Sequence, residues 1–289
     1  MLSQLKSPLL ALLGRQLAYR IGRALYLGAR GDIPNDMTRN GETLVQRCVL
    51  QALAQSGPSA SSLVAFDVGA NIGDWSLSLI ELARQAGRQD HLILHAFEPV
   101  PSTHRTLRGR LPQGAAWLHL HEQAMSASSG TANIYVAADN AGTNSLHSGG
   151  SEGDRQATTI RLTSGAEFCV AEGVQHVHLF KCDTEGHDME VIRGARPLLV
   201  EGRVSVLQFE YNHRWIFSRN SLHDVFLAVS GLPYSVCKLQ GEEVLEFDRW
   251  HPELDKFFEG NYLLVHRDAR AWLPIRTAAF DRYNTLTTH

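Results

Sequence analysis

Two short segments concentrate the side chains that could carry out chemistry. The segment "FKCDTEGHDME" supplies Asp183 and Glu185, and "LQFEYNH" supplies Glu210 and His213. Carboxylates and imidazoles are the groups that remove a proton from a weakly acidic hydroxyl. We therefore take these four residues as the candidate catalytic set. Asp183 and His213 are the preferred general bases, and Glu185 and Glu210 are expected to orient the substrate or the base.

The same acids have alternative roles. Three acids in one loop could ligate magnesium through oxygen, but acids near a helix start more often complement its dipole. We therefore predict no metal site, and a bound divalent metal is the alternative. Asp183 and Glu185 could cap the helix expected from Asp188, and a lone histidine such as His187 or His213 is more often structural or solvated.

A glycine turn precedes these segments in "LVAFDVGANIGDWSLSLI". Its spacing, Gly69 to Gly73, lacks the GxGxxG triplet of dinucleotide sites, and no Lys or Arg lies nearby. Asp67 and Asp74 flank the turn and would repel a diphosphate by about 1 kcal/mol or more per close charge. An ammonium group would be attracted instead, which favours S-adenosylmethionine over a nicotinamide cofactor.

The next strand end carries Glu98 directly before Pro99, where a carboxylate can accept both hydroxyls of a ribose. Glu98 would also suit NAD, or could cap the following helix. The segment "HLHEQAMS" places Gln123 and Ala124 where an adenine would lie, or forms an ordinary polar loop. Trp75 either covers the cofactor or anchors its helix in the core.

These residues require a scaffold that brings strand ends together. Apolar runs alternate with amphipathic segments, which predicts a doubly wound, mostly parallel α/β sheet of seven strands. We expect an N-terminal helical extension over 1–60, the main domain over 61–268 and a tail with a weak helix signal over 269–289. A lid insertion is expected at about 130–165, in which 140–146 could contact a sugar or form a plain turn. The expected strands are 63–68, 92–97, 116–120, 178–182, 204–209, 234–238 and 261–265, and the helices are 41–53, 74–86, 102–110, 188–199 and 221–229.

The ordered segments "FDVGANIGDWS", "HAFEPVPSTHRTL", "HLHEQAMSASSG", "FKCDTEGHDMEVIRGA" and "LQFEYNH" resemble the FkbM family of S-adenosylmethionine-dependent methyltransferases. The resemblance implies a Rossmann-like fold of the class I methyltransferase type. It also implies methylation of hydroxyl groups on sugars, polyketides or other small metabolites. The chain departs from the family pattern at Thr184 and at His187–Asp188. The expected cofactor-binding residues are Asp67, Gly69, Ala70, Asn71, Gly73, Asp74, Trp75, Glu98, Pro99, Gln123 and Ala124.

The resemblance assigns parts of the cofactor to parts of this set. The glycine turn with Asp67 and Asn71 would hold the methionine portion. Glu98 would hold the ribose, and Gln123 with Ala124 the adenine. Two other functions stay open: a nicotinamide-dependent oxidoreductase or epimerase, for which GxGxxG and a YxxxK pair are lacking, and a catalytically silent binding domain.

Composition limits the partners. A net charge of -3 over 289 residues gives no reason to expect nucleic acid as a partner. Four cysteines without CxxC spacing fit reduced thiols in the cytoplasm.

Residues 1–30 contain Lys6 and four arginines but no acid. We expect residues 1–30 to form a helix that packs on its own domain or on a second subunit. The alternative is that this helix attaches to the inner face of the membrane. Arginines interrupt the apolar stretches, which argues against a membrane span or signal peptide.

Overall fold

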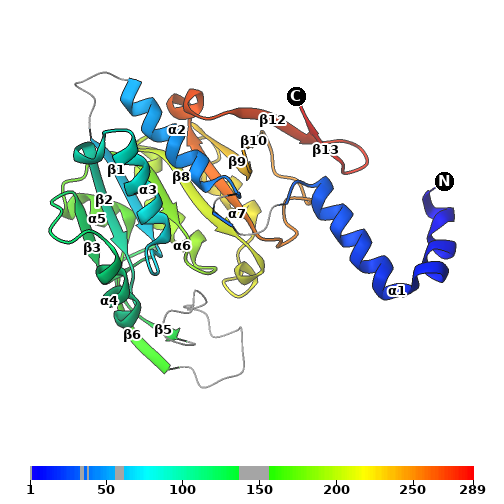
Figure 1. Ribbon diagram of the computed structural model, residues 1–289, viewed down its shortest axis with the longest axis horizontal. Coiled ribbons are helices and arrows are strands. Elements are labelled where there is room, and N and C mark those ends of the chain that lie inside the picture. Colours follow the sequence, from blue (N-terminus) through cyan, green and yellow to red (C-terminus); the bar gives the residue numbers. More distant parts are fainter. Residues whose placement is uncertain (1, 33–35, 38, 56–61, 137–155) are drawn as a thin grey trace.

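The parallel half of a ten-stranded sheet forms the centre of the body (Figure 1). The computed structural model describes residues 2–32, 36–37, 39–55, 62–136 and 156–289. Strands with apolar residues at nearly every position suit a sheet covered on both faces. The five parallel strands run in the order β3 (Leu118–His121), β2 (Leu92–Phe97), β1 (Leu63–Val68), β7 (Val177–Cys182) and β8 (Val204–Tyr211).

The register of these strands places their carboxyl ends side by side. Val68, the last residue of β1, pairs with Phe97 of β2 on one side and with Cys182 of β7 on the other. The loops that follow β1, β2 and β7 therefore leave the sheet at one edge.

The remaining strands extend the sheet beyond β8. Antiparallel β11 separates β8 from β9, and β10, β12 and β13 continue outward. The α/β fold class is confirmed, with three more strands than the seven expected. β10 is a hairpin return of β9 through Gly241, too short to show clear alternation. These strands are β9 (Tyr234–Gln240), β10 (Glu243–Phe247), β11 (Gly260–His266), β12 (Ile275–Phe280) and β13 (Leu286–Thr288).

The C-terminal segment differs from the weak helix that we expected after residue 268. It forms a short 3-10 helix, η3 (Arg267–Trp272), and then β12 and β13. β12 pairs in parallel with β10, and β13 pairs with β12. Pairing with the existing sheet therefore outweighs the weak local helix propensity of this segment.

Helices cover both faces of the sheet. One core cluster includes residues of α2 (Glu42–Gln55), α3 (Asp74–Gln85) and α4 (Pro101–Arg110). The other includes residues of α5 (Gly165–Ala171), α6 (Asp188–Val200) and α7 (Leu222–Ala228). Short 3-10 helices, η1 (Gln89–His91) and η2 (His213–Ile216), follow α3 and β8.

A small second sheet lies beside the carboxyl edge of the main one. It has the order β4 (Ala124–Met125), β6 (Gln156–Thr163) and β5 (Gly130–Val136). Antiparallel β5 and β6 lie within the insertion expected at about 130–165. Residues 140–146, the expected sugar contact, lie outside the described residues.

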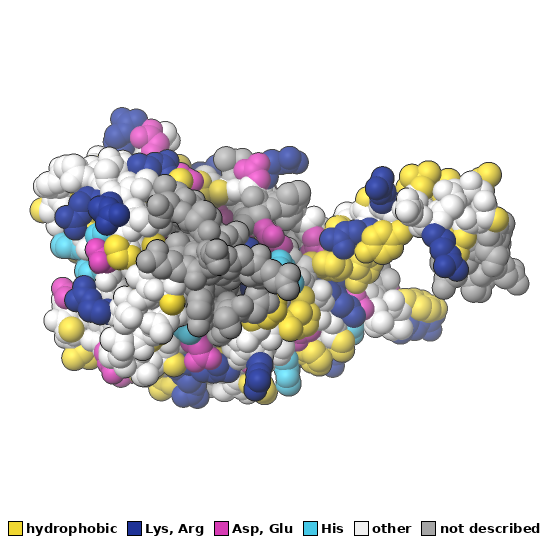
Figure 2. Space-filling view, turned by 90° about the horizontal axis from the view of Figure 1, so that it is seen from below, with side chains coloured by type: hydrophobic (Ala, Val, Ile, Leu, Met, Phe, Trp, Pro, Cys, Tyr) yellow, Lys and Arg dark blue, Asp and Glu magenta, His cyan; other side chains and the backbone are white. Residues whose placement is uncertain are grey.

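The N-terminal helix α1 (Leu2–Ala29) projects away from the body (Figures 1 and 2). A kink at Gly14, with φ of 70°, divides it. In the part of the chain that the structure describes, no helix is both long enough and apolar enough to cross a bilayer.

Candidate functional site

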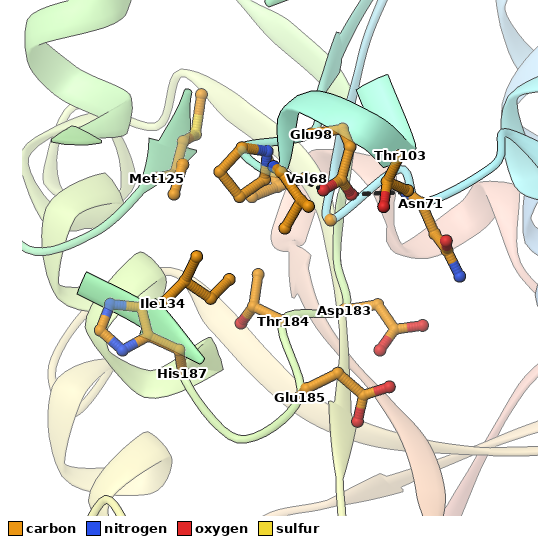
Figure 3. Close-up of a pocket in the computed structure, with 14 residues that line it drawn as sticks. Val68, Asn71, Glu98, Thr103, Met125, Ile134, Asp183, Thr184, Glu185 and His187 are labelled. Carbon is orange, nitrogen blue, oxygen red and sulfur yellow. Dashed lines mark hydrogen bonds between the residues drawn. The ribbon is translucent and has the colours of Figure 1, made fainter. Parts of the chain in front are cut away.

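A cavity opens where β1, β2 and β7 end (Figure 3). One wall is apolar and includes Val100, Met125 and Ile134, the last two from the small sheet. Carboxylates lie elsewhere on the lining, and none of the lining residues is Lys or Arg. The described lining consists of Val68, Gly69, Asn71, Glu98, Pro99, Val100, Thr103, Ala124, Met125, Ile134, Asp183, Thr184, Glu185 and His187.

The glycine turn forms one side of this cavity because its backbone passes very close to the loop after β7. Gly69 has φ of +82°, and its N–H donates to the Phe97 carbonyl at 3.0 Å. A Cβ at Gly69 would lie 1.9 Å from the Asp183 carbonyl oxygen. Only glycine satisfies both the backbone conformation and this close approach.

Glu98 is held in the cavity wall by two backbone donors. Its Oε2 accepts the Asn71 N–H at 3.0 Å, and its Oε1 accepts the Val100 N–H at 2.9 Å. Burial raises the pKa of Glu98 to about 7, although these two donors act to lower it. Each carboxylate oxygen has two lone pairs, so each can accept one further hydrogen bond from a ligand hydroxyl.

Asp67 and Asp74, which we expected to attract a cationic cofactor, do not line the cavity. Asp67 is fully buried and accepts a hydrogen bond from Ser76 Oγ at 2.6 Å; burial raises its pKa to about 6. The Asp74 side chain is 63% exposed and lies 2.8 Å from Arg110 Nη2. Asp67 is bonded to Ser76 in the interior and Asp74 pairs with Arg110 of α4, so neither side chain lies on the described lining.

Trp75 packs in the core beside α2, and its carbonyl accepts the Gln46 side chain at 3.0 Å. This placement fits the core-anchor alternative. Pro99 and Ala124 line the cavity, whereas half-buried Gln123 does not. Ala70 and Gly73 shape the turn from behind the lining: the Ala70 N–H donates to Phe97, and Gly73 is the N-cap of α3.

Asp183 and Glu185 both line the cavity. Asp183 continues from β7, with its N–H bonded to the Val68 carbonyl at 2.9 Å. Its Oδ2 lies 3.0 Å from Lys181 Nζ. The Glu185 carboxylate pairs with the Arg214 guanidinium. The structure therefore brings two of the four candidate catalytic side chains together.

Glu210 and His213 are placed differently. Glu210 is buried just behind the cavity, where Asn212 Nδ2 donates to it at 2.7 Å. Burial, and then the charges of Asp183 and Asp188, raise its pKa well above the usual value. His213 is exposed in η2 and lies outside the lining set.

Asp188, rather than Asp183 or Glu185, organises the loop before α6. It is fully buried, and burial raises its pKa to about 7. Its two oxygens accept the N–H groups of Thr184 at 3.3 Å and Gly186 at 3.2 Å. His187 lines the cavity and lies 3.0 Å from the Ser126 hydroxyl through Nε2.

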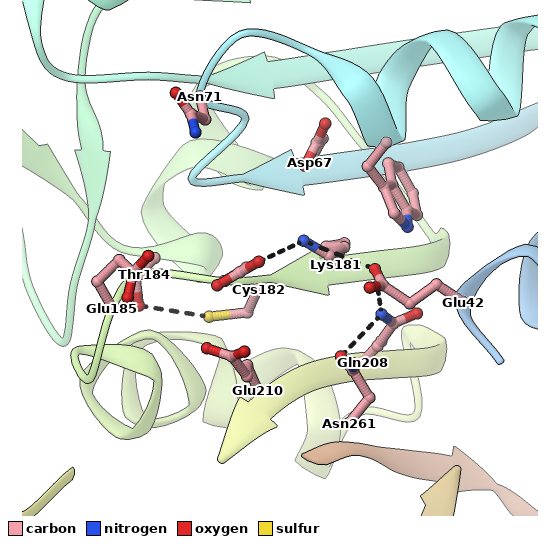
Figure 4. A network of polar contacts seen from close by, with 12 residues as sticks. Glu42, Asp67, Asn71, Lys181, Cys182, Thr184, Glu185, Gln208, Glu210 and Asn261 are labelled. Atoms are coloured by element: carbon pink, nitrogen blue, oxygen red, sulfur yellow. Dashed lines mark hydrogen bonds and ion pairs between the residues drawn. The ribbon is translucent and has the colours of Figure 1, made fainter. Parts of the chain in front are cut away.

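A buried polar network lies behind Asp183 (Figure 4), and its members Glu42 and Gln208 were not predicted from the sequence. Lys181 Nζ lies 3.8 Å from Glu42 Oε2, and Gln208 Nε2 donates to the same oxygen at 2.9 Å. Burial alone would lower the pKa of Lys181, but the carboxylates of Asp183, Glu42 and Asp67 raise it. The carboxylates therefore stabilise the charged form of Lys181 in the interior. In the sequence, Glu42 is distinguished only by its place at the end of the segment "NDMTRNGE" (residues 35–42), which precedes the glycine turn.

Thr103, Met125 and Ile134 also line the cavity without having been predicted, because single apolar or hydroxyl residues carry no motif. Across the described ranges, no three His, Cys, Asp or Glu side chains converge as a metal-binding group.

Comparison with known proteins identifies one family model. It is described as "Methyltransferase FkbM domain" and matches residues 67–238 of the chain. No curated protein matches the sequence.

Solved structures of several methyltransferases show distant likeness. The FkbM methyltransferase from Methylobacillus flagellatus KT has 18% identity and a TM-score of 0.43, covering 70% of this chain and 43% of that one. This chain thus spans less than half of that protein. A precorrin-6y C5,15-methyltransferase from Geobacter metallireducens GS-15 has 13% identity and a TM-score of 0.37, covering 76% and 86%. The plantazolicin methyltransferase BpumL, in complex with SAH, has 8% identity and a TM-score of 0.39, covering 79% and 83%.

Proposed function

Because the chain belongs to the FkbM methyltransferase family, we propose that it transfers a methyl group from S-adenosylmethionine to a hydroxyl of a sugar, a glycan or a small natural product. The observation that carries the proposal is that Glu98 and Asp183 line the same cavity. Glu98 is suited to bind a nucleoside, and Asp183 is suited to bind an acceptor hydroxyl. The match of the family model to residues 67–238 confirms the resemblance inferred from the sequence.

The cavity fits the proposed cofactor in three respects. Glu98 has acceptor capacity for two ribose hydroxyls, as described above. The Gly69–Asn71 turn leaves backbone close to the cavity for the methionine portion. The wall of Val100, Met125 and Ile134 offers apolar contact to an adenine. When bound, the cofactor supplies an electrophilic methyl group on a sulfonium.

Asp183 is the side chain that we propose as general base. Lys181 donates to its Oδ2, which orients the carboxylate and directs Oδ1 to the acceptor hydroxyl. Glu185, held by Arg214, would accept a second hydroxyl and align the acceptor. Glu210 would act from behind the cavity, where it accepts a hydrogen bond from Asn212 and does not contact the acceptor. His213 remains the second candidate base, with an exposed side chain outside the lining as its weakness.

A nicotinamide-dependent enzyme is less well supported. Its diphosphate would enter a cavity with the carboxylates of Glu98, Asp183 and Glu185 and no cationic side chain on the described lining. A silent binding domain would not need this arrangement of acids. We therefore favour neither alternative.

Net acidity and free thiols support a cytoplasmic enzyme that does not bind nucleic acid.

The test uses the full chain. Calorimetry with S-adenosylmethionine and, separately, NAD should show binding of the first only. Methyl-labelled cofactor is then incubated with nucleotide sugars, lipid-linked glycans and polyketides, with Asp183→Asn as the matched inactive control. Label on a hydroxyl, present with the wild type and lost with the variant, supports the proposal. Binding of NAD alone, or transfer to nitrogen only, would overturn it.

A further inference from the structure

The part of α1 after its kink is an amphipathic helix whose apolar face the body leaves uncovered. Leu17, Ile21 and Leu25 follow one another at intervals of four residues, which places them on one face. Their exposed fractions are 48%, 41% and 69%. Figure 2 shows yellow apolar and dark blue basic side chains along this projecting helix.

The body contacts the opposite face of the same helix. The Tyr26 hydroxyl donates to Glu253 Oε2 at 2.6 Å, and the Arg23 guanidinium lies 5.5 Å from the centre of the Phe258 ring. At 100° per residue, Arg23 and Tyr26 lie on the far side of the helix from Leu17, Ile21 and Leu25. Docking on the body therefore turns the apolar stripe toward solvent.

The charge of α1 identifies what can cover that stripe. Arg15 and Arg20 lie on either side of it, and residues 2–29 contain no Asp or Glu. Residues 1–30 hold five of the 27 basic residues, so residues 31–289 hold 22 basic residues and all 30 acidic ones. An anionic lipid surface complements this helix in both respects, with apolar side chains entering the acyl boundary and arginines reaching the headgroups.

A second copy of α1 is a poorer partner. Stripe-to-stripe packing would bring the arginines of two helices together without an acidic residue in either to pair with them. We propose that α1 is an interfacial helix that attaches this protein to anionic membranes, with Leu17, Ile21 and Leu25 in the bilayer surface. The proposal does not depend on the methyl-transfer reaction.

Co-sedimentation of the full chain with vesicles tests the proposal. The probes are vesicles of phosphatidylcholine alone and of phosphatidylcholine with about one third phosphatidylglycerol, a content that gives a surface anionic enough to attract basic segments. We expect binding to the second kind only, weakened by high salt. The combined variant Leu17→Ser, Ile21→Ser, Leu25→Ser should lose it. Its control is Val170→Ser, Val200→Ser, Leu227→Ser, at positions 78%, 52% and 59% exposed on the body.

The charge arm replaces Arg15 and Arg20 by Gln and should lower the partition coefficient about 30-fold, the effect of two basic residues at such a surface. Its control replaces exposed Arg108 and Arg196 by Gln and should change nothing. All variants should unfold at the wild-type denaturant concentration. Undiminished vesicle binding by the triple serine variant overturns the proposal. So does a wild type that ignores vesicles but forms a dimer in ultracentrifugation that this variant abolishes.

Discussion

The ammonium group of Lys181 lies 3.0 Å from the carboxylate of Asp183, and Lys181 pairs with Asp67 of β1 two residues before that acid. The Lys181 side chain is 6% exposed and the Asp183 side chain 31% exposed. A buried cation thus anchors a carboxylate that faces the cavity. The chemistry proposed for Asp183 depends on this pairing.

Replacing Lys181 by Met should be costly. The change keeps the length of the side chain but leaves buried Glu42 without its counter-charge. We expect the free energy of unfolding to fall by about 3 kcal/mol, as for other broken buried pairs. Denaturant titration measures it. The double variant Lys181→Met, Glu42→Gln should recover part of this loss; strictly additive losses would refute the coupling.

Asp183→Asn should lower kcat at least about 100-fold, the contribution of a positioned base. Since the side chain keeps its shape, the dissociation constant of S-adenosylmethionine should stay within about threefold. His213→Ala, a change at an exposed position outside the cavity, serves as the comparison and should leave kcat nearly unchanged. The opposite ranking of the two variants would transfer the role of base to His213.

Cofactor affinity should depend on pH through Glu98. Its pKa in the free protein is raised to about 7, so lowering the pH through 7 protonates the carboxyl and removes its capacity to accept two hydroxyl hydrogen bonds. At pH 6 the affinity for S-adenosylmethionine should be up to about tenfold weaker than at pH 8. Calorimetry across this range measures it. Glu98→Gln should bind weakly and show a flatter profile; an unchanged profile would exclude Glu98 as the ribose ligand.

Gly69→Ala should abolish cofactor binding and destabilise the fold by several kcal/mol, on the order of a strained backbone plus an overpacked contact. The new Cβ would lie 1.9 Å from the Asp183 carbonyl oxygen. Gly87→Ala is the matched control. Gly87 also has a positive φ, +63°, but nothing lies within 4 Å of a Cβ there. Equal effects of the two substitutions would mean that backbone strain alone matters.

Sequence reasoning located the central strands well, and β1 and β2 have the predicted ends to the residue. Both strands are apolar runs bounded by polar or turn residues, and this pattern in the sequence indicates a buried strand. α5 and β10 were missed because each is short and gains its stability from neighbours that are distant in sequence.

The site was predictable where a residue directly follows a strand end. Glu98 and Asp183 directly follow β2 and β7 and line the cavity for this reason, and Glu185 lies two residues further along the same loop. The direction of a side chain was not predictable: Asp67 and Asp74 have the expected charge but turn away from the cavity. The Lys181–Glu42 contact joins α2 to β7, and such pairing across elements has no local signature.

The close approach of Gly69 to Asp183 has a kinetic consequence. The Asp183 N–H is bonded to Val68, and its carbonyl rests against Gly69, so the turn proposed for the cofactor and the loop proposed for the acceptor share one backbone junction. Occupying the turn should therefore steady the loop. We expect an ordered sequential mechanism in which S-adenosylmethionine binds first. S-adenosylhomocysteine should then inhibit competitively against the cofactor and non-competitively against the acceptor.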